Sequence, residues 1–417
     1  MRIAFYSNSP KAATGYGTQT RQLLTRMKAD GHDVCVLGLW GNESGMDAFQ
    51  TPHGPVPIWP HGSVHYGLDV VDAQARAWLG DEPGCVITLY DVWVLQNVWK
   101  GLPVVSWTPI DHDPVTPGVV AWAKTHPTIA MSRFGQQALA KAGVDSVYIP
   151  HAIERVYSPT PSDVRQRMGV PEDAFLVMMN AANIRAPHLD RKAWQQNLRA
   201  FAIFAREHPD AIIYLHTDPT KPSGFPIASF LDYLGLDETR TRITDLLAYR
   251  AGLIEADEMA RLYTASDVLL SCSMGEGFGL AVPEAMACGT PAIVTDFTAQ
   301  PEIVGDTGWK VGWDPFWDEM QRSDMATPAI ADIVEALEAA YAEKGTDAAR
   351  QRSEAARARV LAEYDADTVY AQRWRPFLVA LEQTIREHPP AEQSPPPEPV
   401  KVRKGMSKAA KRRKAAA

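Results

Sequence analysis

Short apolar runs alternate with amphipathic stretches along most of the chain. Residues 1–6 form an apolar run that predicts a buried strand, and a polar loop with Gly15 and Gly17 follows it. Apolar positions at helical spacing then predict a helix over 18–29. Further apolar runs, each expected to be a strand, occupy 34–37, 85–89, 104–107, 128–131 and 147–149. Strands that alternate with helices in this way predict a parallel sheet covered on both faces.

A second series of the same kind begins near Ala174. Its predicted strands are 175–179, 211–215, 268–271 and 292–294, and its predicted helices lie near 193–206, 257–265 and 283–288. A single hydrophobic core stops growing near ~250–300 residues, so a chain of 417 residues, 46% of them hydrophobic, is expected to hold two cores. The fold class predicted is therefore α/β, with two doubly wound, Rossmann-like domains.

The domain boundary is expected in the proline-punctuated stretch 150–173. This assigns residues 1–165 to an N-terminal domain and 166–364 to a C-terminal domain. The stretch 352–381, rich in Ala, Arg, Trp and Leu, predicts one long helix. Residues 386–417 are Pro-rich and then basic, a composition that cannot bury a core and predicts a disordered tail.

The formal charge of −9 is unevenly distributed. Residues 401–417 carry eight Lys and Arg and no acid, which leaves −17 for the other 400 residues. An acidic body argues against nucleic acid binding over the main surface. The basic tail is a candidate for weak contact with an anionic membrane or nucleic acid, and a merely solvated tail is the alternative.

The chain has no apolar segment of signal-peptide length at its start and none that approaches the ~18 residues of a membrane span, so we expect a cytoplasmic protein, peripheral to a membrane only through the tail. Four cysteines lie far apart, without the spacing of a zinc site or a disulfide framework. We expect buried free thiols. Their positions are Cys35, Cys85, Cys272 and Cys288.

The glycine-rich segment 275–291 carries the strongest chemical signal. Its glycines lack Cβ atoms and permit positive φ, so the backbone can approach a ligand closely. Pro283 suits the first position of a helix and Gly289 its end, and the free N–H groups at such a helix start would face an anion such as a diphosphate. Glu276 in the loop and Glu284 in the helix could accept hydrogen bonds from sugar hydroxyls. A solvated Glu276 and a Glu284 that only favours the helix dipole are the alternative.

This segment resembles the E-x7-E signature of family 4 retaining glycosyltransferases, with its Gly-Phe-Gly core and its Ala-Cys-Gly-Thr-Pro ending. Other landmarks of the family occur in the expected order, at 23–37, 130–132, 143–144, 149–153, 263–267 and 296–308. The resemblance extends from residue 1 to about 380. It implies the GT-B fold, in which two Rossmann-like domains face each other across a cleft. It also implies that a C-terminal helix at about 365–385 packs back on the first domain.

The resemblance implies that Glu276 binds the transferred sugar and Glu284 the ribose of a nucleotide diphosphate sugar. The donor-binding loop would comprise Gly277, Phe278, Gly279 and Leu280, whose N–H groups would lie near sugar and phosphate. Gly15 and Gly17 match the glycine loop of the first domain, which reaches the donor phosphate or the acceptor; an ordinary turn is the alternative.

Arg185 and Lys192 match the basic pair of the family, which would stabilise the departing phosphate. The spacing is about one residue longer than in the family, so Arg191 could take the place of Lys192, and a solvated basic turn is the alternative for Arg185.

The segment 106–114 follows a buried strand where the family places a histidine against the donor sugar. His112 or Asp111 could hold that position, and His112 is preferred because imidazole donates to a hydroxyl and titrates near neutrality. Asp111 and Asp113 also form the D-x-D pattern of metal-dependent GT-A transferases, but the E-x7-E architecture argues for a site without metal or other cofactor.

These features predict a retaining, metal-independent glycosyltransferase that uses a UDP- or GDP-sugar and acts by same-face displacement. A GT-B phosphorylase, a nucleotide-sugar epimerase and a catalytically silent sugar-nucleotide binding protein are the alternatives. The acceptor binds to loops of the first domain that vary freely, so a glycan, a lipid, a protein or a modified base all remain open.

Overall fold

The computed structural model describes residues 1–42, 45–95, 98–185 and 189–388. The basic tail, for which weak membrane or nucleic acid contact is expected, lies outside the described residues. None of the helices in the described ranges is long and apolar enough to cross a membrane.

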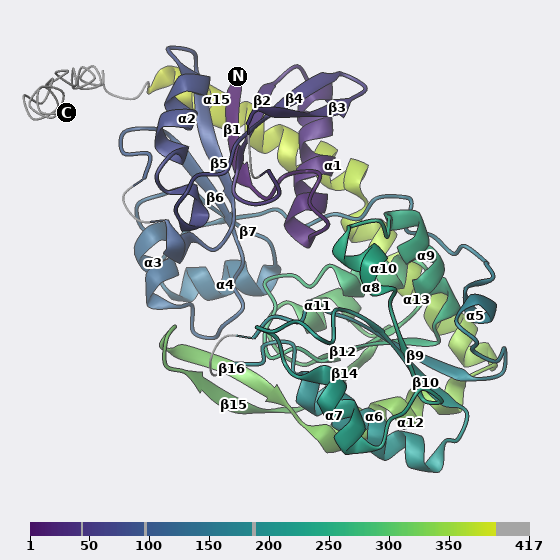
Figure 1. Ribbon diagram of the computed structural model, residues 1–417. Coiled ribbons are helices and arrows are strands. Elements are labelled where there is room, and N and C mark those ends of the chain that lie inside the picture. Colours follow the sequence, from purple (N-terminus) through teal and green to yellow (C-terminus); the bar gives the residue numbers. More distant parts are fainter. Residues whose placement is uncertain (43–44, 96–97, 186–188, 389–417) are drawn as a thin grey trace, which may run out of the picture.

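The first domain is built on an eight-stranded sheet in the order β3-β4-β2-β1-β5-β6-β7-β8 (Figure 1). Apart from the antiparallel β3–β4 hairpin, all neighbours pair in parallel. The strands are β1 (Arg2–Ser7), β2 (Asp33–Gly38), β3 (Asp47–Thr51), β4 (Gly54–Trp59), β5 (Gly84–Leu89), β6 (Val104–Thr108), β7 (Thr128–Ala130) and β8 (Val147–Tyr148). The helices are α1 (Gly15–Ala29), η1 (His65–Gly67), α2 (Val71–Leu79), η2 (Val92–Val94), α3 (Pro117–Ala123) and α4 (Arg133–Lys141).

The second domain is built on a six-stranded parallel sheet in the order β11-β10-β9-β12-β13-β14. Its strands are β9 (Phe175–Asn180), β10 (Ala211–His216), β11 (Thr241–Ile243), β12 (Val268–Ser271), β13 (Ala292–Thr295) and β14 (Trp309–Val311). Its helices are α5 (Val164–Arg167), α6 (Trp194–Glu207), α7 (Ile227–Leu234), α8 (Leu246–Arg250), α9 (Ala256–Ala265), α10 (Ala281–Ala287), α11 (Gln300–Val304) and α12 (Ile330–Glu343). Two doubly wound parallel sheets confirm the predicted fold class, and all four cysteines are buried and free, as expected.

An antiparallel hairpin, β15 (Trp313–Asp318) and β16 (Ser323–Pro328), stands apart from both sheets and was not predicted. None of the residues of β15 is fully buried and its first three are exposed, so the strand lacks the alternation of buried and exposed positions that predicts a half-buried strand. The hairpin reaches the first domain, where the N–H of Asp113 donates to the carbonyl oxygen of Asp324 over 3.1 Å and the hydroxyl of Ser323 donates to the carbonyl oxygen of Pro114.

The prediction of one long helix over 352–381 is wrong. The chain instead forms α13 (Asp347–Tyr364), α14 (Ala366–Val369), the π-helical turn η3 (Tyr370–Trp374) and α15 (Arg375–Glu387). Asp365 breaks the helix because its backbone is extended and its side chain caps the next turn by accepting from the N–H of Thr368. The break lets Ile153, in the connection between the domains, pair with Tyr364 and Ala366 over 2.7 and 3.1 Å.

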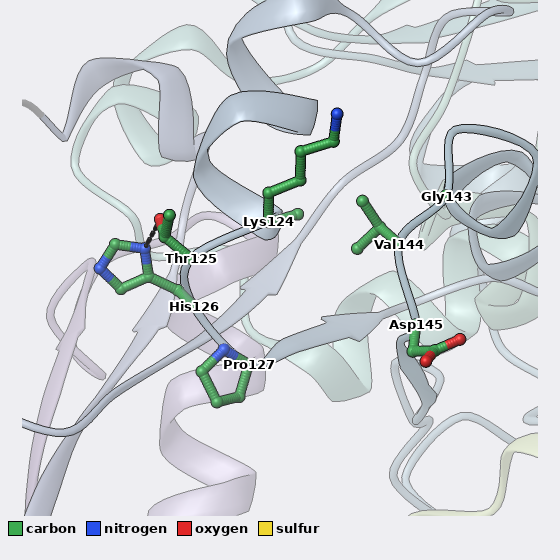
Figure 2. Close-up of a pocket in the computed structure, with 8 residues that line it drawn as sticks. Lys124, Thr125, His126, Pro127, Gly143, Val144 and Asp145 are labelled. Carbon is green, nitrogen blue, oxygen red and sulfur yellow. Dashed lines mark hydrogen bonds between the residues drawn. The ribbon is translucent and has the colours of Figure 1, made fainter.

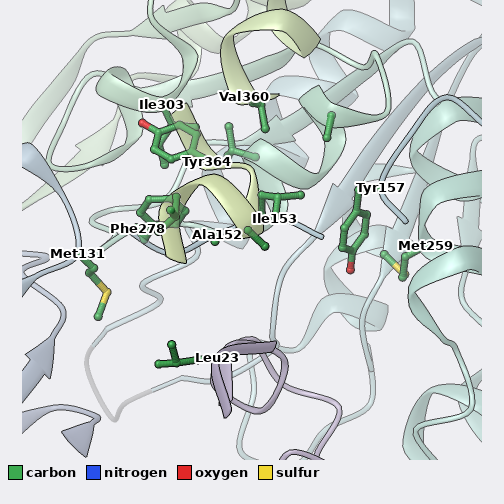
Figure 3. Packing of buried hydrophobic residues seen from close by; sticks show 14 of the residues in the cluster. Leu23, Met131, Ala152, Ile153, Tyr157, Met259, Phe278, Ile303, Val360 and Tyr364 are labelled. Atoms are coloured by element: carbon green, nitrogen blue, oxygen red, sulfur yellow. The ribbon is translucent and has the colours of Figure 1, made fainter. Parts of the chain in front are cut away.

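After this break, α15 lies against the first domain (Figure 1). Arg375 binds Asp30 at the end of α1 over 2.7 Å, and the indole of Trp374 packs edge-on against Trp107 of β6 with ring centroids 4.9 Å apart. One apolar cluster consequently continues from first-domain residues such as Leu23 and Met131 to Phe278 and Tyr364 (Figure 3).

The predicted glycine loop of the first domain is wrong in its secondary structure. Gly15 and Gly17 form the first turn of α1, and Thr14 caps it by accepting from the N–H of Gly17 over 3.0 Å. A Cβ at Gly17 would lie 2.3 Å from the carbonyl oxygen of Ala12, so glycine is required by the close fold of the chain onto this turn.

Candidate active site between the two domains

The E-x7-E loop of the second domain lies directly against the segment that follows β6 in the first domain. A Cβ at Gly275 would stand 2.2 Å from the carbonyl oxygen of Asp111, and one at Gly277 would stand 2.3 Å from Cβ of Pro109. We predicted that these glycines would let the backbone approach a ligand closely, but at Gly275 and Gly277 the close neighbour is the backbone and side chain of the first domain. Gly279 has φ of +94°, a value that favours glycine for its own sake.

Glu276 lies at the centre of this contact and is 8% exposed. Its carboxylate accepts hydrogen bonds from Nη1 of Arg191 over 3.0 Å and from Nζ of Lys192. The same Arg191 nitrogen donates to the carbonyl oxygen of Gly275 over 2.8 Å, which fixes the guanidinium on the loop. The structure therefore brings Arg191 and Lys192 together on Glu276, so neither replaces the other.

The charges of this group are set by burial and by one another. Burial opposes ionisation of Glu276, but Lys192 and Arg191 outweigh it and lower its pKa to about 2. Burial and the neighbouring Arg191 lower the pKa of Lys192. The cluster therefore holds an ionised carboxylate paired with Arg191 and Lys192.

Arg185 is not part of this cluster. It lies in the loop that follows β9, and its side chain is exposed. Its backbone N–H donates to the carbonyl oxygen of Ser223 over 3.3 Å, and its positive charge acts on Asp190. In this state of the molecule Arg191, rather than Arg185, accompanies Lys192.

Glu284 lies in α10 and is 9% exposed. It accepts a hydrogen bond from the hydroxyl of Tyr263 over 2.9 Å, and that hydroxyl in turn accepts from Nδ2 of Asn180 over 2.7 Å. Burial raises the pKa of Glu284 to about 7, although Tyr263 and Tyr157 oppose the shift by hydrogen bonding to the carboxylate. The two carboxylates of the signature thus have separate partners, cations for one and phenols for the other.

His112 is held between two carboxylates and is 6% exposed. Its Nδ1 lies 2.8 Å from Oδ1 of Asp111, and its Nε2 lies 3.3 Å from Oδ2 of Asp318 at the end of β15. Burial acts against the imidazolium, but the hydrogen bonds and charges of Asp111 and Asp318 prevail and raise the pKa of His112. Asp111 and His112 therefore act as a pair, with Asp111 orienting the ring.

Asp318 is a site residue that sequence reasoning missed. It comes from the unpredicted hairpin, about two hundred positions after His112, and nothing in its local pattern points to the first domain. Tyr157, which bonds to Glu284, was missed for a similar reason, since it lies in the connection between the domains.

The loop 275–280, expected to bind the donor, ends in α10, which begins at Ala281, two residues earlier than predicted. Pro283 is accordingly the third helical residue, and Gly289, with φ of +87°, follows the end of the helix as expected. Within the described part of the chain, no group accepts a hydrogen bond from the N–H of Phe278, Gly279 or Leu280. The ring of Phe278 is buried between His151 and Tyr364, with centroids 5.2 and 5.4 Å away.

Gly15 lies opposite this loop. A Cβ at Gly15 would be 2.9 Å from Cδ1 of Leu280, so the first turn of α1 reaches the second domain. Gly17, two residues later, packs against the backbone of Ala12 in the first domain. Of this pair, Gly15 is the one that touches the loop 275–280.

Two hollows of about 390 and 630 Å³ lie on the first domain, around the turn after α3. Figure 2 shows the smaller one, whose rim includes Lys124, His126 and Asp145. Neither is lined by a residue of the interdomain cluster. Across the described ranges, no group of three or more His, Cys, Asp and Glu residues is placed to hold a metal ion.

Comparison with known proteins connects this arrangement to one family. Residues 190–322, which include Arg191, Lys192 and the E-x7-E loop, match the family model described as Glycosyl transferases group 1. The D-inositol 3-phosphate glycosyltransferase of Streptomyces scabiei (strain 87.22) is 28% identical over 322 residues, which cover 70% of this chain and 67% of that protein. Shorter matches to other curated relatives cover as little as 14% of the relative.

Solved structures share the arrangement of both domains. The sucrose-phosphate synthase of Thermosynechococcus elongatus superposes with a TM-score of 0.69 at 18% identity, over 91% of this chain and all (100%) of that chain. The HepE protein of Anabaena, solved in complex with UDP and glucose, gives a TM-score of 0.64 at 18% identity, with the same coverage of 91% and 100%. The chain is therefore similar to the group 1 glycosyltransferases over residues 190–322, and its two domains have the GT-B fold.

Proposed function

We propose that the chain is a retaining glycosyltransferase that moves a sugar from a UDP- or GDP-sugar to an acceptor hydroxyl, without a metal ion. The observation that carries this proposal is the cluster of Arg191, Lys192 and the buried Glu276, whose loop glycines pack against Asp111 and Pro109, next to His112. The site thus combines two cationic side chains that could bind a diphosphate with a carboxylate and an imidazole that could bind a sugar.

The cations supply what the leaving group needs. As the bond from the anomeric carbon to the phosphate oxygen breaks, negative charge grows on the diphosphate, and fixed positive charge in a water-poor site stabilises it. Lys192 and Arg191 bind only Glu276 and the loop backbone in the described part of the chain, so a diphosphate could share them. The free N–H groups of Phe278 to Leu280 would add hydrogen bonds to the phosphate.

The sugar would be held by Glu276 and His112. An ionised Glu276 accepts hydrogen bonds from hydroxyls, and a protonated His112 donates one through Nε2, the nitrogen that now faces Asp318. Glu284 would take the ribose hydroxyls in place of the phenol of Tyr263. The Anabaena HepE structure, solved with UDP and glucose, supports a uridine nucleotide as one candidate donor.

Same-face displacement would account for retention without an enzyme nucleophile. The oxygen of the acceptor bonds to the anomeric carbon on the face from which the phosphate leaves, and the departing phosphate oxygen takes the acceptor proton. Alignment of donor and acceptor by the two domains would contribute most of the acceleration.

A panel of nucleotide sugars tested by thermal unfolding checks this proposal. A true donor should raise the unfolding temperature in a saturable way, because ligand at about 100 times Kd adds about 2.7 kcal/mol of stability. EDTA should leave the shift and the turnover intact. If no nucleotide sugar raises the unfolding temperature, the proposal of a nucleotide-sugar donor is refuted. If EDTA abolishes turnover and manganese restores it, the proposal of a metal-independent reaction is refuted.

A further inference from the structure

The carboxylate of Asp91, in the first domain, has no role in the proposed function. Asp91 follows β5 by two residues, and Asp111 follows the neighbouring β6. The two strands are parallel, with Leu89 opposite Trp107, so both aspartates leave the sheet at the same edge. No other residue of the described ranges donates a hydrogen bond to the carboxylate of Asp91.

The electrostatics place Asp91 at the meeting of the two domains. Burial raises its pKa to about 6, the negative charge of Asp111 adds to the shift, and the positive charge of Arg191 opposes it. This agrees with the sheet edge that Asp91 shares with Asp111, the segment against which the E-x7-E loop packs.

Tyr90, the neighbour of Asp91 in the chain, gathers two further tyrosines around its ring. The ring centroid of Tyr90 lies 5.8 Å from that of Tyr16 and 5.7 Å from that of Tyr66. All three rings are half-buried, so each keeps part of its surface open. Tyr66 has φ of +63°, a conformation that costs a bulky residue energy, and the hydroxyl of Tyr6 holds it by donating to its carbonyl oxygen over 2.8 Å.

Positive charge at this edge of the first domain is already engaged. Lys11, after β1, binds Asp47 over 2.7 Å, and the guanidinium of Arg133, after β7, lies over the ring of Tyr148. His112 is enclosed by two carboxylates. None of these three described residues is free to offset the carboxylates that an anionic group placed beside Asp91 would meet.

We infer that Asp91, with Tyr16, Tyr66 and Tyr90, forms the acceptor subsite, and that it takes an uncharged polyhydroxylated acceptor, a sugar or polyol without phosphate near the reacting hydroxyl. This inference rests on the proposed function. Tyrosine faces pack against the apolar face of a sugar ring, and the carboxylate of Asp91 accepts a hydrogen bond from an acceptor hydroxyl. The proton of the reacting hydroxyl still leaves with the nucleoside diphosphate, so Asp91 positions the acceptor and does not serve as the base.

The test compares Asp91→Asn with the wild type and with Asp81→Asn, an exposed aspartate after α2. With the nucleotide sugar that raises the unfolding temperature, two activities are measured: hydrolysis of the donor in water, and transfer to a panel of neutral sugars and polyols and to their monophosphates. We expect transfer to a neutral compound, with its monophosphate at least tenfold poorer. Asp91→Asn should lower kcat/KM for transfer about 10- to 100-fold, the effect of losing a charge-assisted hydrogen bond to the substrate.

Donor hydrolysis and the donor-induced thermal shift should change less than about twofold in Asp91→Asn, and Asp81→Asn should match the wild type throughout. Preference for a monophosphate, inactivity of every neutral compound, unchanged transfer in Asp91→Asn, or equal loss of hydrolysis and transfer would overturn the inference. If no nucleotide sugar is bound or hydrolysed by the wild type, the proposed function fails first and this inference falls with it.

Discussion

Glu276 and Glu284 belong to one signature and are both buried, but their neighbours give them opposite acidities. Arg191 and Lys192 hold the pKa of Glu276 at about 2, whereas Glu284 has only phenols beside it and its pKa rises to about 7. An ionised carboxylate suits the role proposed for Glu276, which is to accept hydrogen bonds from sugar hydroxyls. A carboxyl poised near neutrality responds to pH and to whatever displaces Tyr263.

Lys192 is the residue whose loss should cost most turnover. Lys192→Ala should lower kcat about 10²- to 10³-fold, the usual effect of removing one preorganised group that stabilises transition-state charge. Folding should be retained, because Arg191 still pairs with Glu276. Lys141→Ala, at an exposed lysine in the last turn of α4, is the matched control for steady-state kinetics. A kcat equal to that of the control would remove Lys192 from the mechanism.

Glu284 should make stability depend on pH. Its folded pKa of about 7 exceeds the ordinary 4.5, so its contribution is fully present below about pH 4.5 and is lost as pH rises through 7. The free energy of unfolding of the wild type relative to Glu284→Gln should fall by at most about 3 kcal/mol over that interval. Urea unfolding at pH 5, 6, 7 and 8 measures this difference; a constant or rising difference would contradict the raised pKa.

At the scale of elements, the hairpin β15–β16 brings parts of the chain together that local patterns cannot link. It carries Asp318 to His112 and pairs Asp324 with Asp113, so a strand pair of the second domain completes a site on the first.

Asp318→Asn should lower the pKa of His112, because it removes one of the two carboxylates that raise it. The titration of His112 can be followed by NMR of its ring protons. Asp314→Asn, at an exposed aspartate of the same hairpin, should leave the titration unchanged. If both variants titrate like the wild type, Asp318 does not control the charge of His112.

The regular elements were the part of the fold that sequence could predict. Runs such as 85–89 and 211–215 became β5 and β10, because a buried parallel strand is apolar on both faces. The break at Asp365 and the hairpin were missed, since each depends on contacts with remote residues such as Ile153 and Pro114. The same limit applies to the site, where the motif located Glu276 and Lys192 but gave no sign of Asp318 or Asp91.

At the scale of the whole molecule, two features hold the domains together. The C-terminal helices cross the connection at Ile153 and seat α15 on the first domain through Arg375 and Asp30. On the other side, the loop glycines allow contact between backbones, with no room for a Cβ at Gly275 or Gly277. Any widening between the domains has to separate this contact first.

Gly277→Ala should therefore force the domains apart. Its Cβ would meet the ring of Pro109, which cannot swing away, and overpacking of this kind costs about 1–3 kcal/mol. Gly15→Ala should cost less, because its Cβ would meet only the mobile tip of Leu280. Urea unfolding and the radius of gyration in solution scattering check both variants. Equal costs and equal radii would show that the glycine contact does not set the domain spacing.

The central claim is that this site cleaves a nucleotide sugar with retention of configuration, and proton NMR of donor hydrolysis tests it without knowledge of the acceptor. The donor is the UDP- or GDP-sugar with an α-linked hexose that raises the unfolding temperature. We expect nucleoside diphosphate and the α-anomer of the free sugar to appear first, with the β-anomer growing only at the rate of mutarotation. Initial release of the β-anomer, or no cleavage of any donor that binds, would contradict it.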